Sequence, residues 1–376
     1  MTHGKIAWKR LLVAAVVLAV SGLAGCARRP TGPIRLGAVL PLTGPAAQYG
    51  KYAREGIELA VSEINESNGI RGRHLEVVFD DSKAEPKEAV TIANRLISVD
   101  RVPVILCLTT SETSAIAPIC ESKKTVLLTG TVAPDAADLG EYVFRNASNL
   151  ATDAETVMRL CQDLKLRRLA VVGLNIDAHL WVENFVRRRL PEFGGQVVAV
   201  ENGNRGDTDF RTQLTKVKAA RPDALYVLGY AEIAYILKQA RELGIAARIF
   251  GDPSMESPEV VQIARNAADG VIYTRAAFDP SSPTSNVRDF TSEYRRRYKR
   301  EPEVFAAQFY DSIHILARVM AERGTMPNDI REGLLSIRNY PGVSGQTTFL
   351  PNGDVRKPVM VKTIRGGKFV TYEPPR

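Results

Sequence analysis

Short apolar segments alternate with segments of helical periodicity along most of the chain, from Ile34 to about Tyr273. The apolar segments are rich in β-branched residues, which favour strands. The segments between them carry apolar residues three and four positions apart, as at Ile57, Ala60 and Ile64, which is the spacing of one helix face. Because repeated strand–helix units build parallel sheets covered by helices, the pattern predicts an α/β fold.

These units form two series, which meet near Arg145. The first series has predicted strands at Ile34–Leu40, Leu75–Phe79, Val102–Leu106 and Val126–Leu128. The second has them near Leu169–Val172, Val197–Val200, Ala224–Leu228, Ile249–Phe250 and Val271–Tyr273. Two series predict two doubly wound lobes, and small ligands of such folds bind beyond the carboxyl ends of the strands or between lobes. The cleft between the lobes is therefore the expected site.

The pattern changes after the second series. Helices are predicted over Thr284–Tyr298, Val304–Arg323 and Pro327–Ile337. Two strand-like segments, Thr347–Leu350 and Val359–Ile364, then flank a turn signal at Pro351–Asp354, and Arg365–Gly367 offers another turn. The chain is therefore expected to end in antiparallel hairpins.

The N-terminus reads as a signal peptide over residues 1–25. Lys5, Lys9 and Arg10 precede an apolar run from Leu11 to Val20, which is too short to span a bilayer as a helix. The run leads into Leu23-Ala24-Gly25-Cys26, which resembles the bacterial lipobox, where cleavage before the cysteine leaves a thiol that carries lipid.

Cys26 is then the lipidated first residue of the mature protein, and residues 26–33 form a linker. An ordinary cleavage site beside a chance cysteine is the alternative. The lipoprotein reading places the protein in the cell envelope, in the periplasm or on the outer face of the cytoplasmic membrane, anchored through Cys26.

The formal net charge of +8 falls to +5 without residues 1–25, which hold three cations and no acid. No basic stripe interleaved with aromatics remains, so nucleic-acid binding is not expected. Cys107, Cys120 and Cys161 are an odd number. A Cys107–Cys120 bridge stays open, and three small buried residues are the favoured interpretation.

Hydroxyl side chains gather after two successive predicted strands. Thr109, Thr110 and Ser111 follow the third strand and open a helix, whose free amides can bind an anion. Gly130 and Thr131 follow the fourth strand, where glycine would let a ligand approach the backbone. The alternatives are a helix cap and an ordinary loop.

No catalytic, metal or cofactor site is expected. The mature histidines, His74, His179 and His314, have no metal-ligand spacing. No Gly-x-Ser-x-Gly elbow and no phosphate-binding glycine loop occurs. Asp80 and Asp81 are best explained by solvated capping or a hinge contact.

The chain resembles the branched-chain amino acid (leucine/isoleucine/valine) binding proteins of ABC transporters, of the type I periplasmic binding fold. The resemblance covers nearly all of the mature chain and is carried by short motifs in a fixed order. They are Gly37–Gly44, Gln48–Gly50, Asn68–Gly72, Phe79–Asp81, the Thr110/Thr113/Pro118 spacing, Asp209–Phe210 and Gln239–Gly244.

The resemblance implies two lobes joined by three crossovers, near Phe144–Ala147, Arg275–Phe278 and Gly342–Thr347. The N-terminal lobe would comprise residues 34–146 plus 278–342, and the C-terminal lobe 147–277 plus 343–376. The lobes would close on a ligand in the cleft by hinge motion.

The family's ligand contacts carry over to a set of positions in this chain. Thr110 with Gly130 and Thr131 would hold a ligand carboxylate. Tyr49, Leu108, Thr109 and Phe305 would shape the side-chain pocket, and Tyr230 would lie near the ligand ammonium. Core packing for Leu108 and Phe305, and a surface location for the tyrosines, are the alternatives.

Two departures from the family pattern concern the ligand. Ala178-His179 replaces a usual Tyr-Gly, which removes an aromatic wall and adds a titratable ring. Where an acidic residue usually pairs with the ammonium, the chain reads Gly251-Asp252-Pro253-Ser254, so Asp252 substitutes from a shifted position or the anchor is missing. The ligand is therefore an amino acid or another small carboxylate.

The implied function is a non-enzymatic lipoprotein that captures a small polar ligand and delivers it to an ABC transporter permease. One alternative keeps the fold but makes the protein a sensor that regulates a kinase or an envelope enzyme. An envelope hydrolase is a third hypothesis, which lacks a recognisable nucleophile–base pair.

Overall fold

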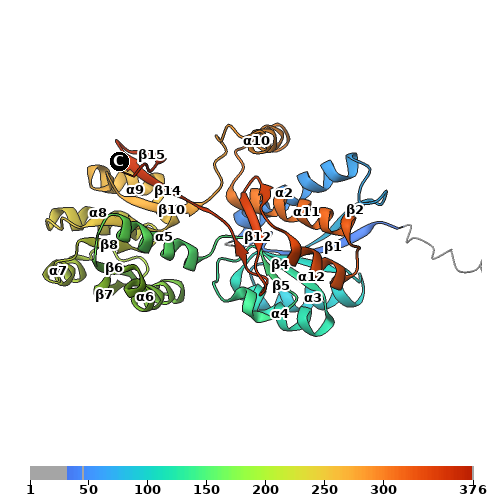
Figure 1. Cartoon of the computed structure of the whole chain (residues 1–376), viewed down its shortest axis with the longest axis horizontal. Coiled ribbons are helices and arrows are strands. Elements are labelled where there is room, and N and C mark those ends of the chain that lie inside the picture. The colour runs from blue at the N-terminus through green and yellow to red at the C-terminus, as the bar shows by residue number, and fades with distance from the viewer. Residues whose placement is uncertain (1–31, 45, 375–376) are drawn as a thin grey trace, which may run out of the picture.

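Two sheets, each packed between helices, form two lobes that lie side by side along the long axis of the molecule (Figure 1). The computed structural model describes residues 32–44 and 46–374. The predicted signal peptide and Cys26 lie outside these residues. Within them, no helix is both long enough and apolar enough to cross a bilayer.

The first lobe is built on a parallel five-stranded sheet in the order β2-β1-β3-β4-β5. Its strands are β1 (Ile34–Leu40), β2 (Leu75–Asp81), β3 (Val104–Cys107), β4 (Val126–Thr129) and β5 (Val143–Arg145). Its helices are α2 (Ala47–Glu66), α3 (Pro86–Ser98), α4 (Thr110–Lys123), η1 (Ala136–Leu139), α10 (Ser285–Tyr298), α11 (Val304–Glu322) and α12 (Pro327–Ser336). The four predicted strands are confirmed, and β5 is an addition.

Neighbouring residues of these strands are buried on opposite faces of the sheet. Leu106 and Leu128 pack on the face covered by α2 and α11, whereas Ile105 and Leu127 pack on the face covered by α3 and α4. Because both faces of the sheet exclude water, the sequences of β3 and β4 are almost continuous runs of apolar residues and not an alternation of apolar and polar residues.

The second lobe is built on a seven-stranded sheet in the order β15-β14-β10-β9-β8-β6-β7. Its parallel strands are β6 (Arg168–Leu174), β7 (Gln196–Gly203), β8 (Ala224–Val227), β9 (Arg248–Gly251) and β10 (Ile272–Ala276). An antiparallel hairpin, β14 (Val359–Arg365) and β15 (Lys368–Thr371), extends it beside β10. Its helices are α5 (Leu150–Asp163), α6 (Asp177–Arg189), η2 (Leu190–Phe193), α7 (Arg211–Ala219), α8 (Glu232–Glu242), η3 (Pro253–Met255), α9 (Pro258–Ala264) and η4 (Arg265–Ala268).

The third connection between the lobes lies later in the chain than Gly342–Thr347. A small sheet of β11 (Tyr340–Gly342), β12 (Gly345–Phe349) and β13 (Val355–Arg356) packs on the first lobe, whose core contains Phe349. The chain crosses only after β13. The expected boundary at residue 342 therefore needs correction.

The expected antiparallel hairpins are present, but the second strand of the first one is β13 and not the segment at Val359–Ile364. The turn at Pro351–Asp354 joins β12 to β13, and β14 pairs with β10 in the other lobe. A turn signal shows that the chain reverses, but it does not show which sheet receives the strand. The second predicted turn, Arg365–Gly367, does join β14 to β15.

Buried polar side chains join the first connection between the lobes, which follows β5, to the segment that leads into the third connection, which follows β13. Arg145, at the end of β5, is fully buried and pairs with Asp354, which precedes β13. Nε of Arg145 donates to Oδ1 of Asp354 at 3.0 Å, and a further guanidinium nitrogen donates to the carbonyl of Ala133. The backbone N–H of Arg145 donates to the Gly353 carbonyl at 3.0 Å.

A second buried pair lies at the third connection itself. Lys357 Nζ is 3.9 Å from Asp311 Oδ2 on α11 and donates to Ser344 Oγ at 2.7 Å. Burial raises the pKa of Asp311, and it lowers the pKa of Lys357 to about 8 although Asp311 opposes that shift. Lys357 and Asp311 therefore stay charged only while their short separation and their hydrogen bonds to Ser344 are kept.

Gly345 lies where the second and third connections touch. It has a φ of +96°, and a Cβ at this position would be 3.1 Å from both Ala277 Cβ and Pro358 Cγ. Ala277 follows β10, so it belongs to the second connection. All other residue types would be strained here as well as crowded.

We expect Asp354→Ala to lower the free energy of unfolding by about 3–5 kcal/mol, because it leaves Arg145 buried without its counter-charge. Urea denaturation followed by circular dichroism would measure the change. Asp209→Ala is the matched control, because its carboxylate forms an ion pair in which both side chains are more than half exposed, and such a pair contributes at most about 1 kcal/mol. An equal loss in both variants would contradict the role of Asp354.

Candidate functional site

The carboxyl ends of the strands in each lobe face the other lobe. The chain leaves the carboxyl end of β5 and enters α5 of the second lobe after Asn146–Asn149. It leaves the carboxyl end of β10 and returns to the first lobe, where Phe278 packs against α2 and α10. Because both connections are short, the loops that follow the strands border the space between the lobes.

On the first lobe, the two hydroxyl-bearing loops meet. Thr110 Oγ1 lies 2.6 Å from Thr131 Oγ1, so the helix start after β3 and the loop after β4 share a hydrogen bond. Thr110 is exposed and Thr131 is buried. Behind them, Thr113 Oγ1 and Thr129 Oγ1 form a second pair at 2.7 Å. This arrangement fixes the two outer hydroxyls in place.

The N-terminus of α4 leaves donors near these hydroxyls. The amides of Thr110 and Ser111 make no hydrogen bond within residues 32–44 and 46–374. The next amide, of Glu112, donates to the hydroxyl of Thr109, which caps the helix. Two free amides, a hydroxyl pair and the positive end of a helix dipole can bind a carboxylate.

Thr109 and Gly130 make contacts within the first lobe itself. The hydroxyl of Thr109 donates a hydrogen bond to the buried carboxylate of Glu112. The amide of Gly130 donates to the Cys107 carbonyl at 2.9 Å, and a Cβ there would be 2.8 Å from the ring of Phe309. The absence of a side chain at Gly130 thus makes room for Phe309, and the expected approach of a ligand to this backbone stays a prediction. Leu108 is buried in the same core.

Tyr49 and Phe305, which are far apart in the sequence, form one aromatic pair. Their ring centroids are 5.2 Å apart, and 52% of Tyr49 is exposed. Phe305 is partly buried at the start of α11. Upstream of Tyr49, the carboxylate of Asp81 accepts the Leu42 amide at 2.8 Å and so holds the loop that leads into α2. Asp81 therefore stabilises this loop through its carboxylate.

On the second lobe, His179 and Tyr230 lie together. Their ring centroids are 5.9 Å apart, and the Arg205 guanidinium lies 5.1 Å from the Tyr230 ring centroid. Burial lowers the pKa of His179 to about 4, with Glu232 opposing the shift. Nδ1 of His179 accepts the Leu174 amide at 3.2 Å, so the neutral ring carries its proton on Nε2 and can donate there.

Asp252 is a buried carboxylate at the carboxyl end of β9. Its oxygens accept the amides of Ser254 at 2.8 Å and Gly229 at 3.3 Å. Burial raises its pKa to about 6, and these hydrogen bonds limit the rise. Gly229 immediately precedes Tyr230, so the acidic group and the tyrosine share one edge of the second lobe.

Sequence reasoning missed a second buried acid, Asp153, in the first turn of α5. Burial raises its pKa to about 7; the hydroxyl of Thr274 lowers it and Asp252 raises it further. One oxygen of Asp153 is buried without a hydrogen-bond partner in the described chain. The signal was present, because Asp153 falls on the apolar stripe that includes Ala154 and Val157.

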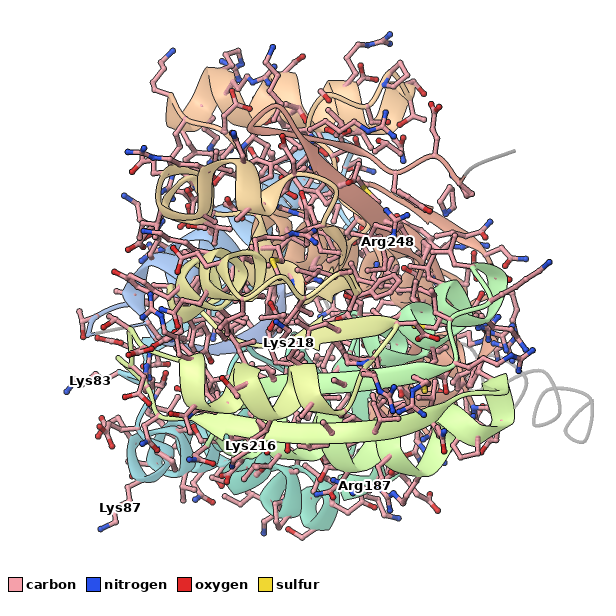
Figure 2. The ribbon with its side chains drawn as sticks, turned by 90° about the vertical axis from the view of Figure 1, so that its left-hand side faces the viewer. Lys83, Lys87, Arg187, Lys216, Lys218 and Arg248 are labelled. Carbon is pink, nitrogen blue, oxygen red and sulfur yellow. The ribbon has the colours of Figure 1, made fainter. Side chains whose placement is uncertain are left out.

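The thiols and potential metal ligands of the described residues form no further site, and the basic side chains are not confined to one lobe. Cys107, Cys120 and Cys161 are buried free thiols, as favoured, with no bridge between Cys107 and Cys120. No group of three potential metal ligands occurs among residues 32–44 and 46–374. Basic side chains such as Lys87, Arg187, Lys216 and Arg248 are scattered over both lobes (Figure 2).

The sequence profile of the periplasmic binding protein family matches residues 33–368. The chain belongs to this family. It is 25% identical over 328 residues to the leucine-, isoleucine-, valine-, threonine- and alanine-binding protein of Pseudomonas aeruginosa, covering 86% of this chain and 87% of the relative. It is 28% identical over 271 residues to the Leu/Ile/Val-binding protein of Escherichia coli, covering 71% and 72%.

Solved structures of this periplasmic binding protein's relatives share the fold. The branched-chain amino acid transporter substrate-binding protein of Streptococcus pneumoniae, in complex with isoleucine, superimposes with a TM-score of 0.73 at 27% identity, covering 91% of this chain and 100% of that one. A leucine-binding protein of Thermotoga maritima gives 0.73 at 28% identity, covering 90% and 98%. The expected family and two-lobed fold are therefore confirmed.

We expect Asp153→Asn to stabilise this periplasmic binding protein at high pH. The folded state keeps the Asp153 proton up to about pH 7, whereas the unfolded chain loses it near 3.8. The unfolding free energy of the parent therefore falls between about pH 4 and pH 7 and then levels off. The variant lacks this fall, so its advantage is greatest above pH 7.

Urea denaturation at pH 4, 6 and 8 without added ligand would measure this difference. Asp163→Asn, at the exposed end of the same helix, is the control and should follow the parent at each pH. A constant offset between Asp153→Asn and the parent would contradict the raised pKa.

Proposed function

We propose that the protein captures an amino acid with an aliphatic side chain between its lobes and delivers it to the permease of an ABC transporter. The observation that carries the proposal is the Thr110–Thr131 hydroxyl pair, 2.6 Å apart beside free amides of α4. Relatives at 25–28% identity are named for leucine, isoleucine and valine binding, which supports this class of ligand.

The first lobe would hold the ligand carboxylate. Thr110 and Thr131 supply hydroxyls, the amides of Thr110 and Ser111 supply N–H donors, and Tyr49 with Phe305 supplies an apolar wall for the side chain. The second lobe would close over the amino end. Asp252 supplies a negative charge there, while Tyr230 and Nε2 of His179 supply polar contacts.

Closure follows from differential contact. A ligand on the first lobe alone gains its carboxylate contacts in both the open and closed states, so these contacts do not shift the equilibrium. The contacts with Tyr230, His179 and Asp252 exist only when the second lobe approaches. They would therefore drive closure, and the closed form would be recognised by the permease.

We further propose that Cys26 carries a lipid after removal of residues 1–25. The support is the order of a basic start, an apolar run and Leu23-Ala24-Gly25-Cys26 in the sequence. The linker would hold the protein on the envelope membrane near its transporter. Globomycin-sensitive processing and mass spectrometry of the mature N-terminus would test this assignment, which Cys26→Ser should abolish.

We expect Thr110→Ala to weaken leucine binding by about 1–3 kcal/mol, because the ligand carboxylate and Thr131 lose a hydrogen-bond partner. Isothermal titration calorimetry on the purified mature protein would measure the affinity. Thr91→Ala on α3 is the control, because its hydroxyl bonds only to the Lys87 carbonyl of its own helix. Unchanged affinity in Thr110→Ala would refute the carboxylate grip.

Asp252→Asn should separate the amino end of the ligand from the carboxylate end. We expect it to weaken leucine at least about tenfold, since a desolvated ammonium loses its counter-charge, and to leave 4-methylpentanoate, which lacks the amino group, within about twofold. Parent affinity for leucine should also fall as the pH drops below about 6, where Asp252 becomes protonated. Equal losses for both ligands would show that Asp252 does not bind the ammonium.

A further inference from the structure

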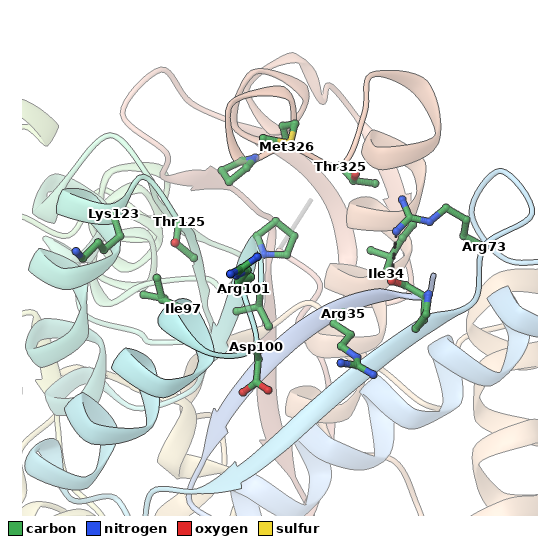
Figure 3. Close-up of a pocket in the computed structure, with 14 residues that line it drawn as sticks. Ile34, Arg35, Arg73, Ile97, Asp100, Arg101, Lys123, Thr125, Thr325 and Met326 are labelled. Atoms are coloured by element: carbon green, nitrogen blue, oxygen red, sulfur yellow. Dashed lines mark hydrogen bonds between the residues drawn. The ribbon is translucent and has the colours of Figure 1, made fainter. Parts of the chain in front are cut away.

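A basic pocket lies at the end of the first lobe opposite the ligand cleft. It has a volume of about 630 Å³ and lies at the amino ends of β1 and β3, beside the start of α12 (Figure 3). Its lining includes the four cations Arg35, Arg73, Arg101 and Lys123, against the single acid Asp100. The cleft described above is at the carboxyl ends of the same strands.

The charges of this pocket are only partly neutralised by the protein. Asp100 is paired with Arg95 outside the pocket, and Arg35 pairs with Glu76 at 3.0 Å. Arg73 donates to the carbonyls of Gly32 and Pro33. Arg101 and Lys123 have neither an ion pair nor a hydrogen bond from their side chains among residues 32–44 and 46–374.

Figure 3 shows how these groups are placed around the pocket. Lys123 comes from one side and Arg35 with Arg73 from the other, while Arg101 lies between them. An adjoining cavity of about 490 Å³ shares Arg73 and adds Arg71. The cations therefore lie around the rim of a hollow, where a compact anionic group could approach them.

Apolar side chains stand exposed at the same end. Met326, which lines the pocket, is 66% exposed, and Val99, which precedes Asp100, is 71% exposed. Cations that flank exposed apolar side chains are the composition of a surface that rests on the interface of a lipid bilayer.

The chain itself brings this end to the membrane. Pro33 and Ile34 line the pocket, so the linker from Cys26 enters the fold at the rim of the cavity. The seven residue-to-residue steps from Cys26 to Pro33 span at most about 25 Å when fully extended. With Cys26 lipidated, the pocket is held close to the headgroups.

We propose that this pocket binds the phosphate-bearing headgroup of an anionic phospholipid, so that the first lobe rests on the membrane with its cleft turned away. The proposal goes beyond ligand capture and uses lipidation of Cys26 only to place the pocket near a bilayer. Each lysine or arginine close to an anionic bilayer strengthens binding by about fivefold. A pocket with two unpaired cations thus adds measurably to the anchor.

The test uses the full mature chain with Cys26→Ser, which removes the lipid contribution. Co-sedimentation with vesicles of phosphatidylcholine and phosphatidylglycerol is compared with vesicles of phosphatidylcholine alone, at low and high salt. We expect binding only to the anionic vesicles, and weakening by salt. Combining Arg101→Glu with Lys123→Glu should weaken this binding at least about tenfold.

The matched control combines Arg187→Glu with Arg188→Glu on α6 of the second lobe, which makes the same change of charge at exposed positions. It should keep vesicle binding within about twofold of the parent. The neutral pair Arg101→Gln and Lys123→Gln repeats the test with a smaller electrostatic change. Leucine affinity is measured in every variant, so that a failure of ligand capture is recognised separately.

Three results would overturn the proposal. One is absence of binding to anionic vesicles by the parent. Another is an equal loss in the first-lobe and second-lobe variants, which would show a general effect of net charge. The third is saturable binding of inorganic phosphate to the pocket without any preference for anionic vesicles, which would identify a site for a soluble anion.

Discussion

The burial of Arg145 is the constraint on which the arrangement of the two lobes depends. Its guanidinium is removed from water at the first connection, so its charge must be matched by Asp354, which belongs to the segment before the third connection. The two connections are thereby fixed to each other. At Gly345, Ala277 of the second connection lies close to Pro358 of the third connection. These contacts link the segments that join the two lobes to one another.

The two halves of the candidate site differ in how far hydrogen bonds within the protein fix their polar groups. On the first lobe, paired hydroxyls and a capped helix hold the candidate donors in one geometry. On the second lobe, 46% of Tyr230 is exposed, and two carboxyl groups, Asp153 and Asp252, are buried at an energetic cost. A cationic group close to Asp252 would relieve part of that cost. In the proposed function, the carboxylate and the amino group of the ligand would therefore be recognised by different lobes.

Much of the fold could be predicted from sequence, because buried parallel strands leave uninterrupted apolar runs and the helices leave periodic ones. β5 was missed because it has only three residues, and β13 because it has two. The pairing of Thr110 with Thr131 followed from adjacent strands. Two features depend on tertiary contacts that no local sequence pattern reveals. Gly130 leaves space for the ring of Phe309, and Phe349 packs in the core of the first lobe.

The division of each lobe between distant parts of the chain also governs when the protein can fold. The core of the first lobe includes Phe349 and Val355, and that of the second includes Ile364 on β14. Neither core can be completed until almost the whole polypeptide has been synthesised, because long-range contacts close last.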